Sequence, residues 1–406
     1  MDKQIRTRRI GPIEPFRIEI PDAALDDLRR RLAATRWPPE LLDGDDGTWR
    51  YGTPLGYLRE LVEYWRDSFD WRAAEARLNA FDQFRVEIDG LRIHFVHARG
   101  TASPGGAAPM PLVITHGWPG SFAEILPMVQ LLTDPDAHCA DPDDAFDVVV
   151  PSLPGFGFSD SPRRRGEWLE TADRWVALMT ALGYERFGAQ SSDIGSRVMR
   201  DLGRSHPERL IGLYLTTDWV DFDGPGADDP SPDEAAYLET DRRWDELEGG
   251  YAHAQGTKPQ TLAVALNDSP AGLAAWIVEK WQAWSDVRAS PEESFSKDEL
   301  LTNVSLYWFG QAIGSSFIPY VESRLPGGDP ATTAARPPWR FIDVPTGVAR
   351  TPGDEPGPMP FDNARRNYRI VRTIDLPRGG HFAASEVPEL LAGEIRHFFG
   401  PLRETD

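Results

Sequence analysis

The segment GAQSSDIGSR at residues 188–197 brings together three side chains that could attack a substrate: Ser191, Ser192 and Asp193. A nucleophile held in a tight strand-to-helix turn needs small residues two positions before and two positions after it, because these positions pack against neighbouring backbone. Asp193 meets this requirement, with Ser191 before it and Gly195 after it. A turn centred on Ser191 places Asp193 at one of the two positions, and a turn centred on Ser192 places the larger Gln190 and Ile194 at both. The spacing therefore favours Asp193 as the nucleophile.

A carboxylate nucleophile restricts the chemistry that the site can perform. Attack on an amide or ester would form an anhydride, whereas attack on the saturated carbon of an epoxide or alkyl halide forms an ordinary ester that water can hydrolyse. The hydrolytic step needs a base and donors that stabilise an oxyanion. The alternative interpretation is that Asp193 is the N-cap of a helix beginning at Ile194, and the local pattern leaves both interpretations open.

The segment THGWPG at residues 115–120 is the candidate oxyanion loop, because it follows an apolar strand pattern and contains a glycine that lets the backbone turn. The backbone N–H groups of Trp118 and Ile194 are the candidate donors. His116 lies in the same segment and is another candidate base. A histidine before a Gly-x-Pro turn is more often structural, so we expect His116 to have a structural role.

The segment PRGGHF at residues 377–382 supplies the better candidate base, His381, in a glycine-rich turn before the last helical pattern. Its position agrees with the chain order nucleophile, acid, histidine. The acid should therefore lie between Asp193 and His381, in a loop that follows a strand. Four carboxylates meet this condition, and the pattern does not choose among them: Asp218, Asp221, Asp354 and Glu355.

Opening an epoxide also leaves an alkoxide that must be protonated, and tyrosine hydroxyls are suitable donors. Four tyrosines lie in the helical insertion described next, and composition leaves the choice open: Tyr237, Tyr251, Tyr307 and Tyr320.

The elements that must position these residues follow from the order of the apolar segments. From residue 111, continuous Val/Ile/Leu runs alternate with helical patterns, which is typical of a parallel sheet covered on both faces. A helical insertion at residues 225–335 interrupts this rhythm, and Ile277, Trp281 and Trp284 share one helical face there, which predicts core packing. Ligands bind at the carboxyl edge of open α/β sheets, so we expect the insertion to form a lid over the site.

The chain is predicted to divide into four segments. The N-terminal domain contains an amphipathic helix and a β-hairpin whose turn is Asp89-Gly90. It is followed by the first part of the α/β core, the lid and the second part of the core, and the predicted bounds are 1–105, 106–224, 225–335 and 336–406.

Composition narrows the possible partners. The 406-residue chain has 64 acidic and 43 basic residues and a formal net charge of −21. This balance argues against nucleic acids and anionic membrane surfaces as partners, since both require basic patches. The single cysteine, Cys139, excludes disulfides within the chain. Because the chain shows neither a secretory signal pattern nor a run of about 18 apolar residues, a cytoplasmic protein is expected.

Several motifs together resemble those of the microsomal and juvenile-hormone type of epoxide hydrolase and its soluble bacterial relatives. The resemblance covers nearly the whole chain and implies an α/β-hydrolase fold with a mostly parallel central sheet, a helical lid insertion and an N-terminal extension domain. It also implies hydrolysis of an epoxide to a vicinal diol through a covalent aspartyl ester. The matching motifs are, in chain order, PFRIEIPDAALDDLRRRL, WRYGTPLGYLRELVEYW, LNAFDQFRVEIDGLRIHFVH, THGWPGS, PSLPGFGFS, ALNDSPAGLAAWI, LLTNVSLYW, VPTG and PRGGHFAA.

Carried over by position, the resemblance assigns a role to each site residue. Asp193 is the nucleophile, His381 the base, and Asp354, in the TPGD stretch after VPTG, the acid. The tyrosines that protonate the epoxide oxygen are Tyr251 and Tyr320, and the HGWP turn is the oxyanion loop, with Trp118 and Ile194 as donors. The implied partners are a small-molecule epoxide and water, and no metal or organic cofactor is implied.

Two positions depart from the family pattern. Ser191 and Ser192 replace a usual Gly-Gly pair, and Thr351 replaces a phenylalanine before the acid loop. The serine pair keeps a second hypothesis open, in which the scaffold performs a non-hydrolytic reaction such as a cyclisation. A non-catalytic ligand-binding homologue is the third hypothesis. Some bacterial relatives act in natural-product pathways, which extends the prediction to enediyne or polyketide biosynthesis. The oligomeric state is left open, with a homodimer as one alternative.

Overall fold

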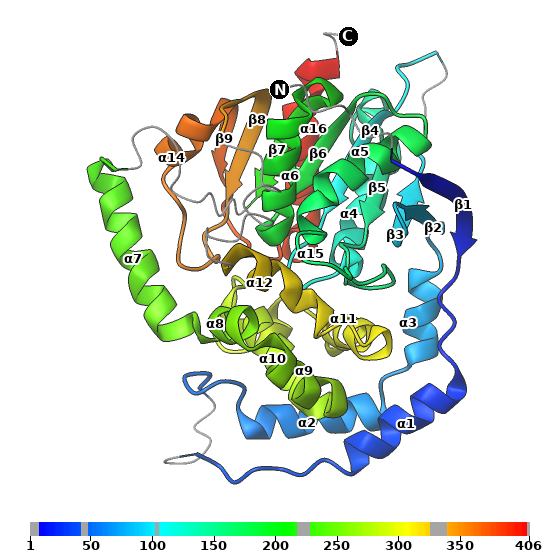
Figure 1. The fold of residues 1–406 in the computed structure, drawn as a ribbon, viewed down its shortest axis with the longest axis vertical. Helices are drawn as coiled ribbons and strands as arrows, with labels where there is room; N and C mark the ends of the chain where they lie inside the picture. Colours follow the sequence, from blue (N-terminus) through cyan, green and yellow to red (C-terminus); the bar gives the residue numbers. More distant parts are fainter. Residues whose placement is uncertain (1–7, 42–47, 102–104, 217–227, 325–338, 404–406) are drawn as a thin grey trace.

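The centre of the molecule is a twisted sheet, shown in Figure 1. The structure is a computed structural model that describes residues 8–41, 48–101, 105–216, 228–324 and 339–403. Within these residues the sheet has nine strands in the order β1-β2-β3-β5-β4-β6-β7-β8-β9. The strands are β1 Ile10–Phe16, β2 Gln83–Ile88, β3 Leu91–Ala98, β4 Met110–Thr115, β5 Phe146–Pro151, β6 Phe187–Ser191, β7 Leu210–Thr216, β8 Ile342–Arg350 and β9 Tyr368–Asp375.

The pairing of the strands confirms the predicted fold class. From β5 to β9 every neighbouring pair is parallel, whereas β1, β2 and β3 add an antiparallel edge. Figure 1 shows helices covering both faces of this sheet. The helices of the core are α4 Leu126–Thr133, α5 Thr171–Ala181, α6 Asp193–Ser205, α14 Phe361–Asn367, α15 Ala383–Glu386 and α16 Pro388–Arg403.

The central strands are largely apolar because both of their faces are covered. Successive side chains of a strand point to opposite faces, and two hydrophobic cores result. Val113 of β4 and Val149 of β5 belong to the core that includes α5 and α6. Their neighbours Leu112 and Val148 belong to the core that includes α4 and α16. Continuous apolar runs in the sequence therefore correspond to strands buried on both sides.

The N-terminal segment adds strands to the sheet, and its helices pack against the helical insertion. Its helices are α1 Asp22–Ala33, α2 Leu55–Asp67 and α3 Trp71–Leu78. The predicted hairpin is confirmed by β2 and β3, which pair on either side of a turn where Asp89 has φ 53° and Gly90 has φ 81°. Two successive positive φ values are those of a two-residue hairpin turn.

The insertion is helical, as predicted, and lies beyond the carboxyl edge of the sheet (Figure 1). The helix α10 contacts both α1 and α2, so the lid is packed between the N-terminal helices and the core. Ile277, Trp281 and Trp284 are buried, which confirms core packing for this face. The helices are α7 Pro232–Glu248, α8 Gly250–Thr257, α9 Pro259–Asp268, α10 Pro270–Ala283, α11 Lys297–Gly310 and α12 Ile318–Arg324.

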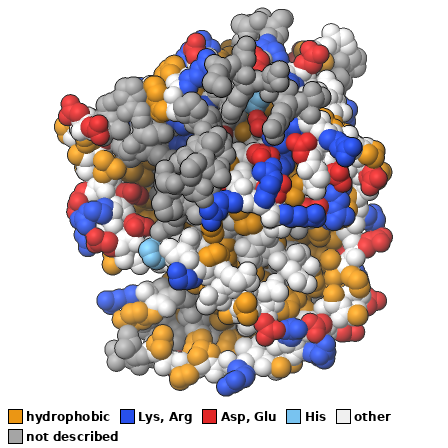
Figure 2. Space-filling model, in the orientation of Figure 1, with side chains coloured by type: hydrophobic (Ala, Val, Ile, Leu, Met, Phe, Trp, Pro, Cys, Tyr) orange, Lys and Arg blue, Asp and Glu red, His pale blue; other side chains and the backbone are white. Residues whose placement is uncertain are grey.

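The surface carries charges of both signs. Figure 2 shows Lys and Arg side chains interspersed with Asp and Glu side chains over the face in view. In the described part of the chain, no single helix is long and apolar enough to span a bilayer. The helices α9 and α10, bent by 115° at their junction, meet the length and composition test only when they are taken together.

Candidate active site

The turn between β6 and α6 presents Asp193 at the carboxyl edge of the sheet. Asp193 has φ 51°, in the left-handed region that residues with a side chain seldom adopt outside tight turns. A Cβ at Gly195 would lie 2.6 Å from the carbonyl oxygen of Thr115 and 2.9 Å from that of His116. The predicted need for a small residue two positions after Asp193 is therefore confirmed, because β4 and its loop approach the turn at this point.

The two serines before Asp193 have different environments. Ser191 is buried at the end of β6, and its Oγ lies 3.3 Å from the Oγ of Ser196. Ser192 is the N-cap of α6, with φ −135° and no side-chain capping bond. This φ is ordinary extended backbone, so the turn does not require glycine at position 192. Because Ser192 occupies the N-cap, the alternative interpretation of Asp193 as the N-cap is wrong.

The loop after β4 lies directly against Asp193. A Cβ at Gly117 would lie 2.5 Å from Oδ1 of Asp193, so only glycine permits this approach. The backbone N–H of Trp118 donates to the same Oδ1 at 2.8 Å. Ile194 is the second residue of α6 and is buried. Trp118 thus contacts the carboxylate as expected for a donor, and the role of the Ile194 amide stays a prediction.

Two buried side chains of α11 hold this loop in place. Asn303 donates from Nδ2 to the carbonyl oxygen of Pro119 at 2.8 Å, and the Tyr307 hydroxyl donates to that of Gly120 at 2.7 Å. Tyr307, one of the four candidate proton donors, therefore uses its hydroxyl to position the loop.

His116 has the structural role that its position predicts. It is fully buried; its Nε2 accepts a hydrogen bond from the Leu153 amide at 3.1 Å, and its Nδ1 lies 3.0 Å from the carbonyl oxygen of Gly117. Burial lowers the pKa of His116 to about 4. Both ring nitrogens are engaged with backbone, which leaves neither of them to act on a substrate.

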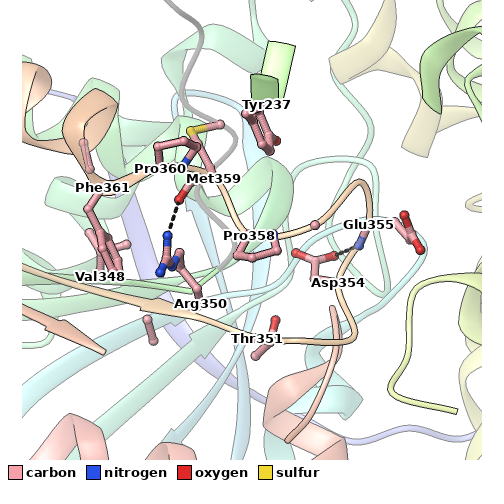
Figure 3. Close-up of a pocket in the computed structure, with 13 residues that line it drawn as sticks. Tyr237, Val348, Arg350, Thr351, Asp354, Glu355, Pro358, Met359, Pro360 and Phe361 are labelled. Carbon is pink, nitrogen blue, oxygen red and sulfur yellow. Dashed lines mark hydrogen bonds between the residues drawn. The ribbon is translucent and has the colours of Figure 1, made fainter. Parts of the chain in front are cut away.

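The loop after β8 brings Asp354 to His381. Oδ1 of Asp354 lies 3.0 Å from Nδ1 of His381, and Oδ2 of Asp193 lies 3.8 Å from its Nε2. Figure 3 shows Asp354 and Glu355 pointing in different directions from the loop, and the Glu355 amide donates to Oδ1 of Asp354 at 3.0 Å. The remaining two candidate acids lie outside the described residues: Asp218 and Asp221.

Arg350 holds the loop that carries Asp354. The guanidinium of Arg350 donates to both carboxylate oxygens of Asp375, at 2.6 Å and 2.8 Å, and to the Met359 carbonyl at 3.0 Å. A cavity of about 40 Å³ lies here, lined by Asp354 and Tyr237 but by neither Asp193 nor His381 (Figure 3). Tyr237 therefore belongs to the surroundings of the acid loop.

The turn that carries His381 is tied to the lid segment after α10. The His381 amide donates to the carbonyl oxygen of Trp284 at 2.7 Å, and the Gly379 amide donates to Oδ2 of Asp286 at 3.0 Å. The Trp284 ring also lies 4.9 Å from the His381 ring. Lid and base are therefore fixed to one another, and Trp284 contributes to the site as well as to the core.

Glu386 clamps the same turn. Burial raises its pKa to about 7, although backbone hydrogen bonds lower it. The local pattern around Glu386 predicts no role for it, because one of its partners, Asp286, lies 100 residues away in the chain. Its carboxylate accepts hydrogen bonds at 2.8 Å, 3.1 Å and 3.1 Å from the amides of Asp286, Gly380 and Phe382.

The electrostatics of the site favour a protonated base in the resting state. Burial lowers the pKa of His381, but the charges of Asp354, Asp193 and Glu124 outweigh burial and raise the pKa to about 9. An imidazolium beside three carboxyl groups is the expected form at neutral pH.

The helical insertion brings two of the candidate tyrosines together beside Trp118. Tyr251 of α8 and Tyr320 of α12 have ring centroids 5.9 Å apart, and both rings lie near Trp118, at 5.2 Å and 5.8 Å. Burial raises the pKa of both hydroxyls, and the charge of Asp193 adds to this effect. Of the four candidate tyrosines, these two are the pair that the geometry brings together near Asp193.

A further buried acid, Glu124, lies in the 3₁₀ helix Phe122–Ile125. Its Oε2 packs against Gly120, where any Cβ would overlap it, and has no hydrogen-bond partner among the described residues. Burial raises its pKa to about 8, with His381 opposing and Asp193 adding to the effect. Sequence reasoning missed Glu124, since its spacing from the oxyanion loop carries no recognised signal.

Together these residues can perform two consecutive reactions. A carboxylate that accepts a hydrogen bond from an amide N–H, with two tyrosines near it, can attack an electrophilic carbon while the leaving oxygen is protonated. A histidine paired with a second carboxylate can then activate water against the resulting ester.

Comparison with protein families gives two matches. Residues 13–125 match the family described as "Epoxide hydrolase N terminus", and residues 110–251 match the family described as "alpha/beta hydrolase fold". The first match covers the N-terminal segment and the oxyanion loop, and the second covers the core from β4 into the lid.

Relatives match over nearly the full chain. A protein of Stigmatella aurantiaca (strain DW4/3-1), provisionally named an epoxide hydrolase, is 43% identical over 96% of this chain and 86% of its own. Epoxide hydrolase 1 of Sus scrofa is 35% identical over 97% of this chain and 89% of its own. The crystal structure of juvenile hormone epoxide hydrolase from Bombyx mori has a TM-score of 0.81 and 29% identity, over 97% of this chain and 95% of that one.

Proposed function

The chain belongs to the epoxide hydrolase family, whose members hydrolyse the ether bond of an epoxide, and we propose that it does so through a covalent ester on Asp193. The product of this reaction is a vicinal diol. The observation that supports the proposal most directly is the position of the Asp193 carboxylate. One oxygen accepts the Trp118 amide, and the other lies 3.8 Å from Nε2 of His381.

In the first step, a carboxylate oxygen of Asp193 attacks a ring carbon of the epoxide. The carbon–oxygen bond of the ring breaks, and the electron pair moves to the epoxide oxygen. Tyr251 or Tyr320 donates a proton to this oxygen, which leaves a phenolate and a hydroxyalkyl ester. The two tyrosines are suited to this role because their rings lie together against the ring of Trp118, whose amide donates to Oδ1 of Asp193.

Ester formation itself prepares the second step. It removes the negative charge of Asp193, one of the charges that raise the pKa of His381. His381 then gives up its proton more readily, and this proton passes to the tyrosine phenolate and restores the phenol. The neutral His381, oriented by Asp354, acts as a base on water that attacks the ester carbonyl. The amides of Trp118 and Ile194 stabilise the oxyanion that forms. When the ester bond breaks, the second proton of the water goes to the leaving alcohol, the Asp193 carboxylate is regenerated, and the proton taken from water stays on His381 as in the resting state.

A single turnover in ¹⁸O-water tests this scheme, with enzyme in excess over styrene oxide. The new hydroxyl oxygen of the first diol should come from Asp193, so the diol should be unlabelled and the label should appear in the peptide that contains Asp193. Label in the first-turnover diol would contradict the ester intermediate, because it would mean that water attacks the epoxide directly.

Three finer points remain proposals that rest on the sequence alone: a role in natural-product biosynthesis, a cytoplasmic location and a homodimeric assembly. For the first, the test is turnover of a polyketide-derived epoxide against that of styrene oxide. A polyketide epoxide hydrolysed with lower efficiency than the simple aryl epoxide would argue against a biosynthetic role.

A further inference from the structure

Lys280 of α10 is a buried cation that the scheme above does not use. The residue is 5% exposed. Its Nζ lies 4.8 Å from the centroid of the Tyr251 ring and 5.7 Å from that of the Trp284 ring. Lysine is rarely buried, because its ammonium group loses hydration. A buried ammonium therefore needs an opposite charge nearby. Its position over the ring of Tyr251, a proposed proton donor, raises the question of what the charge does there.

The partner is the adjacent Glu279. Its Oε2 lies 2.8 Å from Nζ of Lys280, so the buried ammonium has a carboxylate beside it. The Glu279 side chain is 20% exposed and lines a hollow of about 400 Å³ between the lid and the N-terminal helices. Water can therefore screen the glutamate charge, whereas the ammonium faces the buried rings of Tyr251 and Trp284.

When Tyr251 gives up its proton it becomes a phenolate, and the surroundings of Tyr251 disfavour this negative charge. Burial raises the pKa of Tyr251, and the charges of Asp193 and Asp245 add to this effect. A hydrogen bond from Tyr320 and the charge of Arg197 lower it. These groups lie on α6, α7 and α12, and Lys280 adds a cation from α10. A positive charge over an aromatic face attracts the ring, and it attracts the phenolate more strongly.

We propose that Lys280 is a positioning residue for the first step, whose ammonium stabilises the negative charge left on Tyr251 when the tyrosine protonates the opened epoxide. In this step the O–H bond of Tyr251 breaks, an O–H bond forms on the epoxide oxygen, and the electron pair stays on the phenol oxygen. The inference rests on the proposed function, because it assumes that Tyr251 is a proton donor.

A double-mutant cycle separates this electrostatic role from simple packing. The rate of ester formation is measured in single turnovers with excess enzyme and styrene oxide, by rapid quench and mass detection of the modified peptide. Lys280→Met should slow ester formation by about tenfold or more, and Lys280→Arg should restore most of the rate because it keeps the charge. In the Tyr251→Phe background, Lys280→Met should change the rate by less than about twofold. The phenylalanine ring still packs on the side chain but has no hydroxyl to ionise, and Tyr320 supports the residual reaction.

A matched control comes from the same lid. Lys297 lies over the Tyr64 ring at 5.9 Å and pairs with Glu292 at 3.2 Å, so Lys297→Met removes a similar contact in a different place and should leave ester formation unchanged. Lys280→Gln serves as a second neutral variant should Lys280→Met fold poorly.

The outcomes separate the two proposals. An equal loss for Lys280→Met in both backgrounds, or no loss in either, would overturn the role of Lys280. A Tyr251→Phe variant that forms the ester at the full rate would instead overturn the role of Tyr251 in the proposed function.

Discussion

At the scale of single residues, Asp193 differs from the neighbouring serines in the groups that its side chain contacts. Its carboxylate contacts the Trp118 amide and faces His381, whereas the Ser191 hydroxyl is directed to Ser196 within the turn. The spacing of small residues predicted this outcome, because it reflects contacts within a few ångströms of the turn. The partners of Asp193 come from segments more than sixty residues away and carry no such local signal.

Asp354, the proposed acid, is the residue whose role can be tested most directly. Asp354→Asn should slow ester hydrolysis by at least about 10²-fold, because the amide can neither stabilise an imidazolium nor hold the His381 ring in its working tautomer. Ester formation should be slowed less, so that the ester accumulates. The measurement is intact-protein mass after rapid mixing with styrene oxide.

Glu355→Gln is the matched control, because Glu355 is the adjacent acid and its side chain points in a different direction from that of Asp354 (Figure 3). It should hydrolyse the ester at nearly the wild-type rate. Equal losses for the two variants would mean that the loop, and not the contact of Asp354 with His381, sets the rate.

At the scale of elements, the lid segment after α10 joins the two loops that carry the acid and the base. The Gly353 amide donates to the carbonyl oxygen of Gly379 at 3.0 Å, which links the two loops directly. A Cβ at Gly353 would lie 2.6 Å from the Cα of Asp286, and one at Gly380 would lie 2.5 Å from the Trp284 carbonyl oxygen. Glycine at these positions therefore lets one lid segment contact both loops.

Gly380→Ala is expected to disturb this junction. The added methyl group meets backbone, which cannot rotate away, so the lid or the His381 turn must move. We expect a loss of about 1–3 kcal/mol in the free energy of unfolding together with a fall in kcat, measured by denaturant unfolding and steady-state turnover.

Gly393→Ala in α16 provides the comparison, because a Cβ there meets only the end of the Arg396 side chain at 4.0 Å. Alanine in a helix interior is favoured over glycine by roughly 0.5–1 kcal/mol, so this variant should be as stable as the wild type or more so. A fully active and stable Gly380→Ala enzyme would argue against the junction.

At the scale of the whole molecule, the site concentrates ionisable groups in a buried volume. The pKa values of His381 and Glu124 are both raised, but for different reasons: burial lowers the pKa of His381 and neighbouring carboxylates more than offset this, whereas burial is the main cause that raises the pKa of Glu124. The two raised values have opposite effects on the stability of the fold. A raised pKa stabilises the fold when the charged form is the protonated one, as in His381, up to the pH at which that form is lost. For Glu124 the raised pKa reflects the cost of burying its anion.

Glu124→Gln should therefore stabilise the protein increasingly as the pH rises. The ordinary carboxyl pKa of 4.5 becomes about 8 in the folded chain, so between these values the folded state binds more protons than the unfolded state. Wild-type stability falls over this window by at most about 1.4 kcal/mol per pH unit from this group. Glutamine does not titrate, so the free energy of unfolding of the variant does not fall in this way. The measurement is urea unfolding of both proteins at pH 5 and pH 8.

The surface variant Glu389→Gln serves as the comparison, because Glu389 is exposed at the start of α16. Its difference from the wild type should change much less between the two pH values. A Glu124→Gln difference that is constant with pH would show that Glu124 is already ionised in the folded protein at pH 5.

The amino-acid sequence by itself determined the alternation of strands and helices, the helical insertion, the hairpin turn and the nucleophile turn, because each depends on neighbouring residues. It left four acids and four tyrosines open, and only the resemblance to a family chose among them. The tertiary structure decided that Asp354 meets His381 and that Tyr251 and Tyr320 meet each other, because such contacts depend on how distant segments approach. It alone revealed Glu124, Glu386 and Lys280, whose charges matter only because the fold has removed them from water.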